Sequence, residues 1–387
     1  MSLDRCSEEC SSSSSGPERL QHFNRIIAFA CHTEPMKRAI AFAERLSDTA
    51  LAVVAGVNLL FLALFVLTLV AVSGRQARAT DISCDAANLM QTLSPEAVVR
   101  IRAAEAQTPN ADALLYEVRK GENPPSFLFG TMHVADPRVL AMTPAARQAL
   151  EQASTIVIET TDILDPKKMA AAIFGDPSLT SFTGKQSLKD LFSPEDYAML
   201  ADVMRERGLP LVTVAKMRPW MISASLAVSA CETERKKAGA KVLDESIGAY
   251  ANENGKALVG LESGLDQIRA IAATPDELHA ASLLEMARHA DQMTGVFETM
   301  IALYLEGRPG AIMPMMREIL PGAADDAPGY AEFEQELILK RNETMAEAGA
   351  PMLAQGGAFM AVGALHLPGE EGLVEKLRRR GFTVTAR

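Results

Sequence analysis

Four ionisable side chains of this 387-residue sequence stand just beyond the ends of four short apolar runs. In chain order they are His133, Glu159, Glu262 and His366. The runs before them are short and bounded by turn residues, which predicts buried strands. Because the carboxyl ends of strands in an open α/β sheet border the binding crevice, we expect the four side chains to meet there. Two imidazoles with one or two carboxylates suit a divalent metal ion, so the pattern predicts a metal site.

Two glycines strengthen this interpretation. Gly130 and Gly363 each precede one of the histidines, His133 and His366, by three positions. A glycine at a strand end permits a sharp turn or a close approach of backbone, which can aim the imidazole into the site. The alternative is that the histidines are hydrogen-bonded structural residues. Two such motifs, combined with both glutamates, favour a functional site over that alternative.

The segments that must position these residues alternate between predicted strands and helices. Turn residues between 116–119 and 126–131 predict a β-hairpin. Further strands are expected at 155–158, 257–261, 359–362 and 382–385, and helices at 144–152, 220–231, 242–253, over most of 275–304, and up to Arg380. This alternation predicts an α/β fold with a central mixed β-sheet flanked by helices.

Composition and motifs exclude several classes of protein. The formal net charge is -11, and no basic stripe is present, which argues against a nucleic-acid partner. The basic run that ends at Arg380 precedes Gly381, as is usual at the end of a helix. The sequence contains neither a His-Glu-x-x-His nor a Gly-x-Ser-x-Gly motif, so the common zinc-protease and serine-hydrolase signatures are missing.

An apolar segment near the N-terminus, Ala50–Val72, is long enough to span a membrane, which takes about 20 residues. Lys37, Arg38 and Arg45 precede it and Arg75 and Arg78 follow it, so the slight excess of basic residues on the N-terminal side places the C-terminal part outside by the positive-inside rule. We therefore expect one N-terminal transmembrane helix in a bacterial inner membrane, followed by a periplasmic domain. The alternative is secretion to the periplasm after cleavage near Ala79.

This segment defines the expected domain organisation. The predicted divisions are a disordered cytoplasmic segment at 1–47, a transmembrane signal-anchor at 48–74 and an α/β domain at 80–387. Cys84 and Cys231 are the only cysteines beyond the membrane segment. Disulfides persist outside the cytoplasm, so the two cysteines are expected either to form a disulfide or to remain as two buried thiols.

The order and context of several short motifs resemble the TraB/GumN family, over roughly Cys84 to Arg387. The motifs are Phe129–Val134, Ile158-Glu159, Leu258–Glu262, Arg341-Asn342 and Val362–Gly369. The resemblance implies an α/β fold related to the Tiki metalloproteases, in which paired Gly-x-x-His motifs and a glutamate support manganese- or cobalt-dependent peptide cleavage. It also implies a relation to pheromone-shutdown proteins, which act on signalling peptides.

Residue by residue, the paired motifs match Gly130 with His133 and Gly363 with His366, and the motif glutamate matches Glu159. Glu262 and Arg341 fit the wider pattern of the family. The resemblance therefore places the expected site on positions that the strand pattern had already selected.

The sequence thus predicts a membrane-tethered, metal-dependent hydrolase that acts on a peptide or a small-molecule substrate. His133, His366 and Glu159 are the expected ligands of a manganese, cobalt or zinc ion. Glu159 or Glu262 is the expected general base, and Arg341 is a further candidate catalytic residue. Two alternatives remain open: a peptide-binding protein without catalytic activity, and a metal-free esterase that uses a His–Glu pair.

Overall fold

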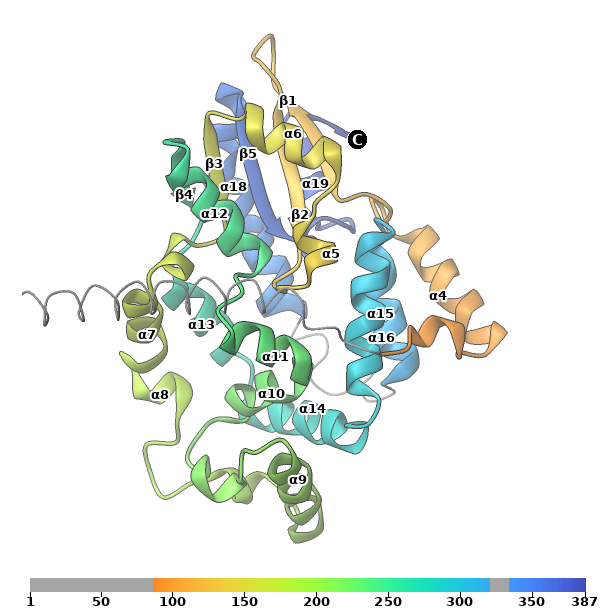
Figure 1. The fold of residues 1–387 in the computed structure, drawn as a ribbon, viewed down its shortest axis with the longest axis vertical. Coiled ribbons are helices and arrows are strands. Elements are labelled where there is room, and N and C mark those ends of the chain that lie inside the picture. The colour runs from red at the N-terminus through yellow and green to blue at the C-terminus, as the bar shows by residue number, and fades with distance from the viewer. Residues whose placement is uncertain (1–85, 321–333) are drawn as a thin grey trace, which may run out of the picture. The chain divides into compact units, whose positions relative to one another are not determined.

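Six strands form one mixed sheet at the centre of the protein. The computed structural model describes residues 86–320 and 334–387. The strands are β1 (Leu115–Arg119), β2 (Ser126–Thr131), β3 (Thr155–Ile158), β4 (Ala257–Gly260), β5 (Ala358–Gly363) and β6 (Thr383–Ala386). Their order in the sheet is β4-β3-β5-β2-β1-β6 (Figure 1). The predicted α/β class and the mixed sheet are confirmed for the described residues.

The sheet has a parallel part and an antiparallel part. Strands β4, β3, β5 and β2 are neighbours and run parallel to one another. The predicted hairpin is confirmed, because β1 pairs with β2 in antiparallel register, and β6 continues that part along the other edge of β1. All four carboxyl ends of the parallel strands therefore open on one edge of the sheet, and these are the strands that precede the four predicted site residues.

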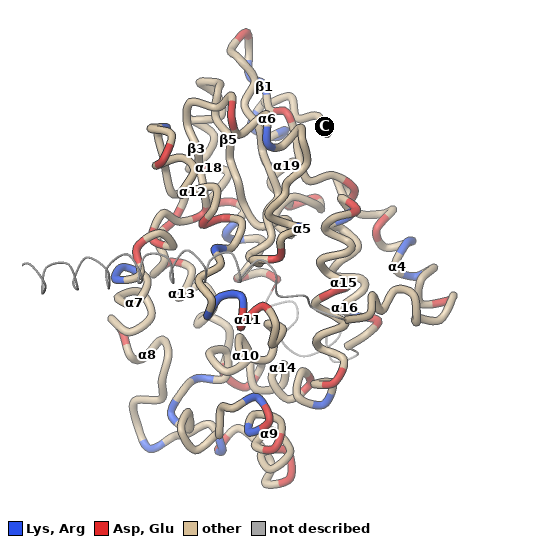
Figure 2. Tube along the Cα trace, in the orientation of Figure 1, with Lys and Arg blue, Asp and Glu red and all other residues tan. Residues whose placement is uncertain are grey.

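Both faces of the sheet are covered by helices. On β5, Phe359 and Ala361 belong to the core on one face, whereas Met360 and Val362 belong to the core on the other. The first face packs against α5 (Pro137–Leu140), α6 (Pro144–Gln152) and α12 (Leu243–Glu253), and the second against α18 (Lys340–Gln355) and α19 (Leu373–Arg379). The parallel strands contain no charged residue, so β3 and β5 are tan in Figure 2. Their apolar composition is that of strands buried on both faces.

The remaining described helices complete the fold, and most of them contribute to smaller apolar clusters. They are α4 (Pro95–Gln107), α7 (Pro166–Phe174), α8 (Pro177–Thr180), α9 (Pro194–Glu206), α10 (Pro219–Ala227), α11 (Ala230–Lys237), α13 (Gly264–Ala272), α14 (Asp276–Arg288), α15 (Met293–Leu305) and α16 (Ile312–Ile319). Helices α4, α15 and α16 share one cluster, and α9, α10 and α14 share another. Short 3-10 turns and one π-helical turn, Gln335–Leu339, complete the described elements.

One predicted helix was wrong in extent. The expected helix over 220–231 ends at Ala227, and a second helix, α11, begins at Ala230. The hydroxyl of Ser229 accepts a hydrogen bond of 3.2 Å from the backbone amide of Glu232, which caps the new helix. A serine three residues before a glutamate is a common start signal for a helix, and it outweighs the apolar character of the segment around it.

The N-terminal predictions lie outside the described residues. These are the apolar segment Ala50–Val72, the boundaries at 1–47 and 48–74, and Cys84. Within 86–320 and 334–387, no helix combines the length and the apolar character needed to cross a membrane. Cys231 lies on α11, but its pairing with Cys84 stays a prediction, as does the membrane segment.

Candidate active site

The four predicted site residues come together at the carboxyl edge of the parallel strands. Glu159 follows β3 directly, Glu262 lies in the turn after β4, and His133 lies in the loop after β2. His366 ends a 3-10 turn, Ala364–His366, that follows β5. Because these four strands are neighbours in the sheet, they bring together residues that are up to 233 positions apart in the sequence.

Gly363 lies at the centre of the group. Its backbone amide donates a hydrogen bond of 2.6 Å to Glu159 Oε1. A Cβ atom placed on Gly363 would lie 3.2 Å from Glu159 Oε1, 3.4 Å from His366 Cδ2 and 3.9 Å from His133 Nε2. A single small space therefore borders all three predicted metal ligands, and the missing side chain of Gly363 keeps this space open.

Gly130 has a different role at the matching position. A Cβ atom there would lie 2.7 Å from Leu367 Cδ1 and 3.0 Å from Ala364 Cα, so glycine permits β2 to approach the turn after β5. The Gly130 carbonyl accepts a hydrogen bond of 2.9 Å from the hydroxyl of Tyr304. Neither Gly130 nor Gly363 has a positive φ. Both glycines serve close approach, which is one of the two roles that the sequence suggested.

His366 is held inside the protein. Its residue is only 4% exposed, and its Nδ1 lies 2.7 Å from Asn342 Oδ1 on α18. Asn342 Nδ2 donates to the Glu371 carbonyl at 2.9 Å, which fixes the orientation of the amide. Nδ1 is therefore the donor to Asn342, and Nε2 carries the lone pair, 3.4 Å from Arg341 Nη1 and 3.8 Å from Glu159 Oε1. Burial lowers the pKa of His366 to about 4, which favours this neutral form.

His133 is held differently. Its side chain is 55% exposed, and its Nδ1 lies 2.7 Å from Asp244 Oδ2 on α12. The hydroxyl of Thr131 donates to the other oxygen, Asp244 Oδ1, at 2.7 Å. The negative charge of Asp244 raises the pKa of His133 to about 9, against the opposing effect of desolvation. Because Nδ1 is engaged, the ring presents Nε2 toward Gly363, where an added Cβ would lie 3.9 Å from it.

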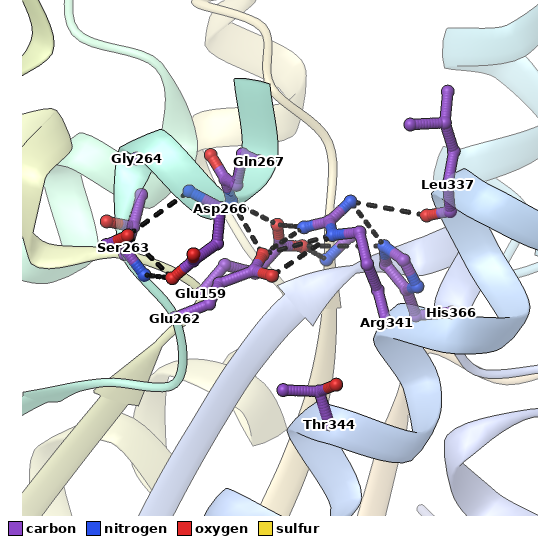
Figure 3. A network of polar contacts seen from close by, with 12 residues as sticks. Glu159, Glu262, Ser263, Gly264, Asp266, Gln267, Leu337, Arg341, Thr344 and His366 are labelled. Carbon is purple, nitrogen blue, oxygen red and sulfur yellow. Dashed lines mark hydrogen bonds and ion pairs between the residues drawn. The ribbon is translucent and has the colours of Figure 1, made fainter. Parts of the chain in front are cut away.

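Arg341 bridges the two glutamates. It reaches from α18 toward Glu159, Glu262 and His366 in Figure 3. Its Nη2 donates to Glu159 Oε2 at 2.6 Å and also to Glu262 Oε1, while its Nε donates to Glu262 Oε1 and Oε2 at 3.1 and 3.3 Å. Gln267 on α13 donates from Nε2 to Glu159 Oε2 at 3.1 Å and to Glu262 Oε1 at 2.9 Å. These donors hold the two carboxylates next to each other through charge-assisted hydrogen bonds.

The carboxylate of Glu159 consequently has two distinct sides. Oε2 faces Arg341 and Gln267, and Oε1 faces Gly363 and His366. Desolvation would raise the pKa of Glu159, but the cationic groups around it, His133 and Arg341 among them, and the Gly363 amide lower it to about 2. Glu159 is therefore ionised at any physiological pH, and one of its oxygens faces the histidines.

These donors fit a divalent metal ion. Within the described parts of the chain, no three His, Cys, Asp or Glu side chains already form a metal-binding group. His366 Nε2 and Glu159 Oε1 are 3.8 Å apart, however, and one ion with bonds of about 2.0–2.2 Å spans donors up to about 4 Å apart. His133 Nε2 borders the same space beside Gly363. Nitrogen and carboxylate donors with their outer atoms already hydrogen-bonded are typical of metal sites.

Three contributors to the site escaped the sequence analysis. Asp244 and Gln267 were not singled out, and Asn342 was noted only as part of a motif, without its contact to His366. Asn342 could have been suspected because it follows Arg341 in the chain. No pattern in the sequence distinguishes Asp244 or Gln267 from the other polar residues on their helices.

Comparison with known proteins agrees with this arrangement. The TraB/PrgY/gumN family matches residues 114–386, which include all six strands. Two zebrafish (Danio rerio) proteins are similar: the metalloprotease TIKI1, 24% identical over 324 residues, and the metalloprotease TIKI2, 26% identical over 309 residues. The matches cover 72% and 67% of this chain but only 64% and 58% of the relatives. No solved structure matches. Because the family match extends over the whole sheet and its site, the chain belongs to the TraB/PrgY/gumN family.

Proposed function

We propose that this protein is a metal-dependent hydrolase that cleaves a peptide or peptide-like bond. The observation that carries the proposal is the approach of His133 Nε2, His366 and Glu159 Oε1 to one small space beside Gly363. Family membership and the similarity to two proteins named metalloproteases support the same chemistry. The full chain spans less than two thirds of each of those relatives, so its substrate is proposed only by class.

In this proposal His133 and His366 hold a manganese, cobalt or zinc ion through Nε2, and Glu159 holds it through Oε1. Such an ion, when bound, polarises a carbonyl group and lowers the pKa of a bound water molecule. The remaining residues set the positions of these donors. Arg341 fixes the second oxygen of Glu159, so the first oxygen stays turned toward the histidines.

The two glutamates are proposed to differ in role. A general base works best when its pKa is near the operating pH, and a pKa of about 2 suits a charged ligand better. Both oxygens of Glu262 accept hydrogen bonds from Arg341, and Oε1 also accepts one from Gln267. We therefore assign Glu159 as a ligand and Glu262 as the counter-ion that holds Arg341 in place.

The deciding experiment is elemental analysis of the protein purified without chelator, followed by assay on a peptide library with and without chelator. Bound metal and chelator-sensitive cleavage are the expected results. Metal without cleavage would favour a peptide-binding protein. Activity that survives complete metal removal would favour the metal-free esterase, for which His366 Nε2 and Glu159 Oε1, 3.8 Å apart, are the His–Glu pair.

Matched amide substitutions test the roles of the glutamates. Glu159→Gln keeps the shape of the side chain but removes its charge, so we expect loss of bound metal together with a fall in turnover of about 10²–10⁴-fold. Glu262→Gln is the control, because it changes the neighbouring carboxylate without touching the histidines, and it should retain metal. Full metal occupancy in Glu159→Gln, with turnover lost, would instead make Glu159 the general base.

A further inference from the structure

Asp244 is placed unusually for an acidic residue at the start of a helix. It lies in the first turn of α12, where an acidic side chain ordinarily faces solvent beside the positive end of the helix dipole. Instead it is only 3% exposed. The backbone amide of Val242, just before α12, donates a hydrogen bond of 3.0 Å to Oε2 of Glu245, the neighbour of Asp244. The Asp244 carboxylate is therefore available for contacts outside its own helix.

Both oxygens of that carboxylate are directed at the loop that carries His133. Oδ2 lies 2.7 Å from His133 Nδ1, and Oδ1 accepts the Thr131 hydroxyl at 2.7 Å. The backbone of the same loop is tied to α12 as well, since the Leu243 amide donates to the Val134 carbonyl at 3.2 Å. Three hydrogen bonds thus join the first turn of α12 to the segment 131–134.

The support behind Asp244 is rigid. Leu243 and Ile247 are each 1% exposed and belong to the core between α12 and the sheet. The His133 ring, by contrast, is largely exposed and has Asp244 as its one hydrogen-bond partner among the described residues. Packing cannot fix the orientation of so exposed a ring, so the hydrogen bond that its Nδ1 donates to Asp244 must do so.

We infer that Asp244 is the positioning residue for His133, holding Nδ1 so that Nε2 is presented to the metal space beside Gly363. The inference rests on the proposed function, because it concerns a ligand of the proposed metal ion. A carboxylate behind an imidazole also increases the electron donation of the imidazole to a metal. His366 has only the neutral amide of Asn342 behind it. Asp244 therefore makes His133 the stronger donor of the pair.

The test is a titration of Co²⁺ or Mn²⁺ into the metal-free full chain and its variants. Asp244→Asn should weaken metal affinity by about 10–100-fold, as expected for loss of an outer partner of a ligand, and Asp244→Ala by at least as much. The titration is run at two pH values, because metal binding displaces any proton that the ligand carries. A loss of metal affinity that is caused by misplacement of the His133 ring should appear at both pH values.

Tyr304→Phe is the matched control. It removes a buried hydrogen bond to the carbonyl of Gly130, which lies on β2, the strand that precedes His133. It leaves His133 and Asp244 untouched, so the metal affinity of this variant should equal that of the parent. In the metal-free variants, NMR of the His133 ring should show more motion than in the parent for Asp244→Ala, and no more than in the parent for Tyr304→Phe. This readout separates positioning from a general loosening of the strand end.

The outcomes separate this inference from the proposed function. If the parent binds metal tightly and Asp244→Asn and Asp244→Ala bind it equally well, the positioning role is wrong while the hydrolase proposal stands. If the parent binds none of the metals and its His133→Ala and His366→Ala variants behave like it, the proposed function fails, and the inference built on it is overturned too. Weaker binding in both Asp244 variants, with Tyr304→Phe unchanged, supports the inference.

Discussion

His133 and His366 reach the same space from opposite surroundings. His366 is 4% exposed and is backed by a neutral amide, whereas the side chain of His133 is 55% exposed and is backed by a carboxylate. The direction of the pKa shift differs accordingly, downward for His366 and upward for His133. Two histidines from the same short motif therefore obtain opposite acid–base properties, His366 from burial and His133 from the charge of Asp244.

The difference follows from what each location can accept. A buried ring is most stable when neutral, and an amide oxygen accepts a hydrogen bond from its N–H without introducing a charge into the core. An exposed ring is not held by packing, so a charged partner that makes a stronger hydrogen bond is needed to fix it. The pair teaches that the Gly-x-x-His motif specifies where an imidazole lies, while its burial and the charges around it decide its protonation.

The largest expected effect comes from removing each ring. His366→Ala and His133→Ala should each weaken metal binding by more than about 100-fold, since each removes a ligand. Only His366→Ala should also destabilise the metal-free fold strongly, by about 2–4 kcal/mol, because it leaves a cavity and an unpaired Asn342 oxygen in the interior. Metal titration and urea unfolding measure the two effects. Equal loss of stability in both variants would contradict the comparison.

A smaller effect is expected from the two motif glycines. Gly363→Ala introduces a methyl group 3.2 Å from Glu159 Oε1 and should lower metal affinity with little loss of stability. Gly130→Ala introduces one 2.7 Å from Leu367 Cδ1 and 3.0 Å from backbone, so it should destabilise the fold by about 1–3 kcal/mol. The same pair of measurements distinguishes them. A Gly363→Ala variant that binds metal like the parent would show that the space beside Gly363 is not the metal site.

The smallest effect is the pH dependence of stability in the metal-free protein. The pKa of His133 is raised from 6.5 to about 9, so its contribution is full below pH 6.5 and is lost as the pH rises through about 9. The pKa of His366 is lowered from 6.5 to about 4, so its contribution is full above pH 6.5 and is lost as the pH falls through about 4. Unfolding curves of the parent and of each His→Ala variant, compared across pH, isolate the two contributions.

Opposite signs are the critical result of that comparison. The stability difference between the parent and His133→Ala should shrink in alkali, and the difference between the parent and His366→Ala should shrink in acid. Differences that change in the same direction for both variants would mean that Asp244 does not raise the pKa of His133 or that burial does not lower the pKa of His366.

The strand-borne part of the site could be predicted from the sequence. His133, Glu159, Glu262 and His366 each follow a short apolar strand, and parallel pairing necessarily brings the carboxyl ends of neighbouring strands to one edge. Arg341 was found through its motif. The strand-end residues could be identified from the sequence because a strand has only two faces and a defined end. Position along the chain therefore indicates position in the fold.

The helix-borne part could not be predicted in the same way. Asp244 and Gln267 lie on helices with other polar residues, and the rotation of a helix against the sheet is set by packing that spacing does not encode. The wrong extent of the predicted helix over 220–231 has a related cause, since its apolar content concealed the capping serine at position 229. Core composition fixed the elements, but individual side-chain contacts depended on tertiary packing.

Arg341 and Asn342 are adjacent on α18 and contact different atoms of the site: Arg341 donates to the two glutamates and lies 3.4 Å from His366 Nε2, whereas Asn342 contacts His366 Nδ1. Each residue of an α-helix is turned by about 100° from the one before it, so inserting a residue between the two would carry Asn342 away from His366 while Arg341 stayed in place. The dipeptide can therefore be gained or lost as a whole, but it cannot be spread apart. In evolutionary terms, we expect the two positions on α18 to be kept or lost together.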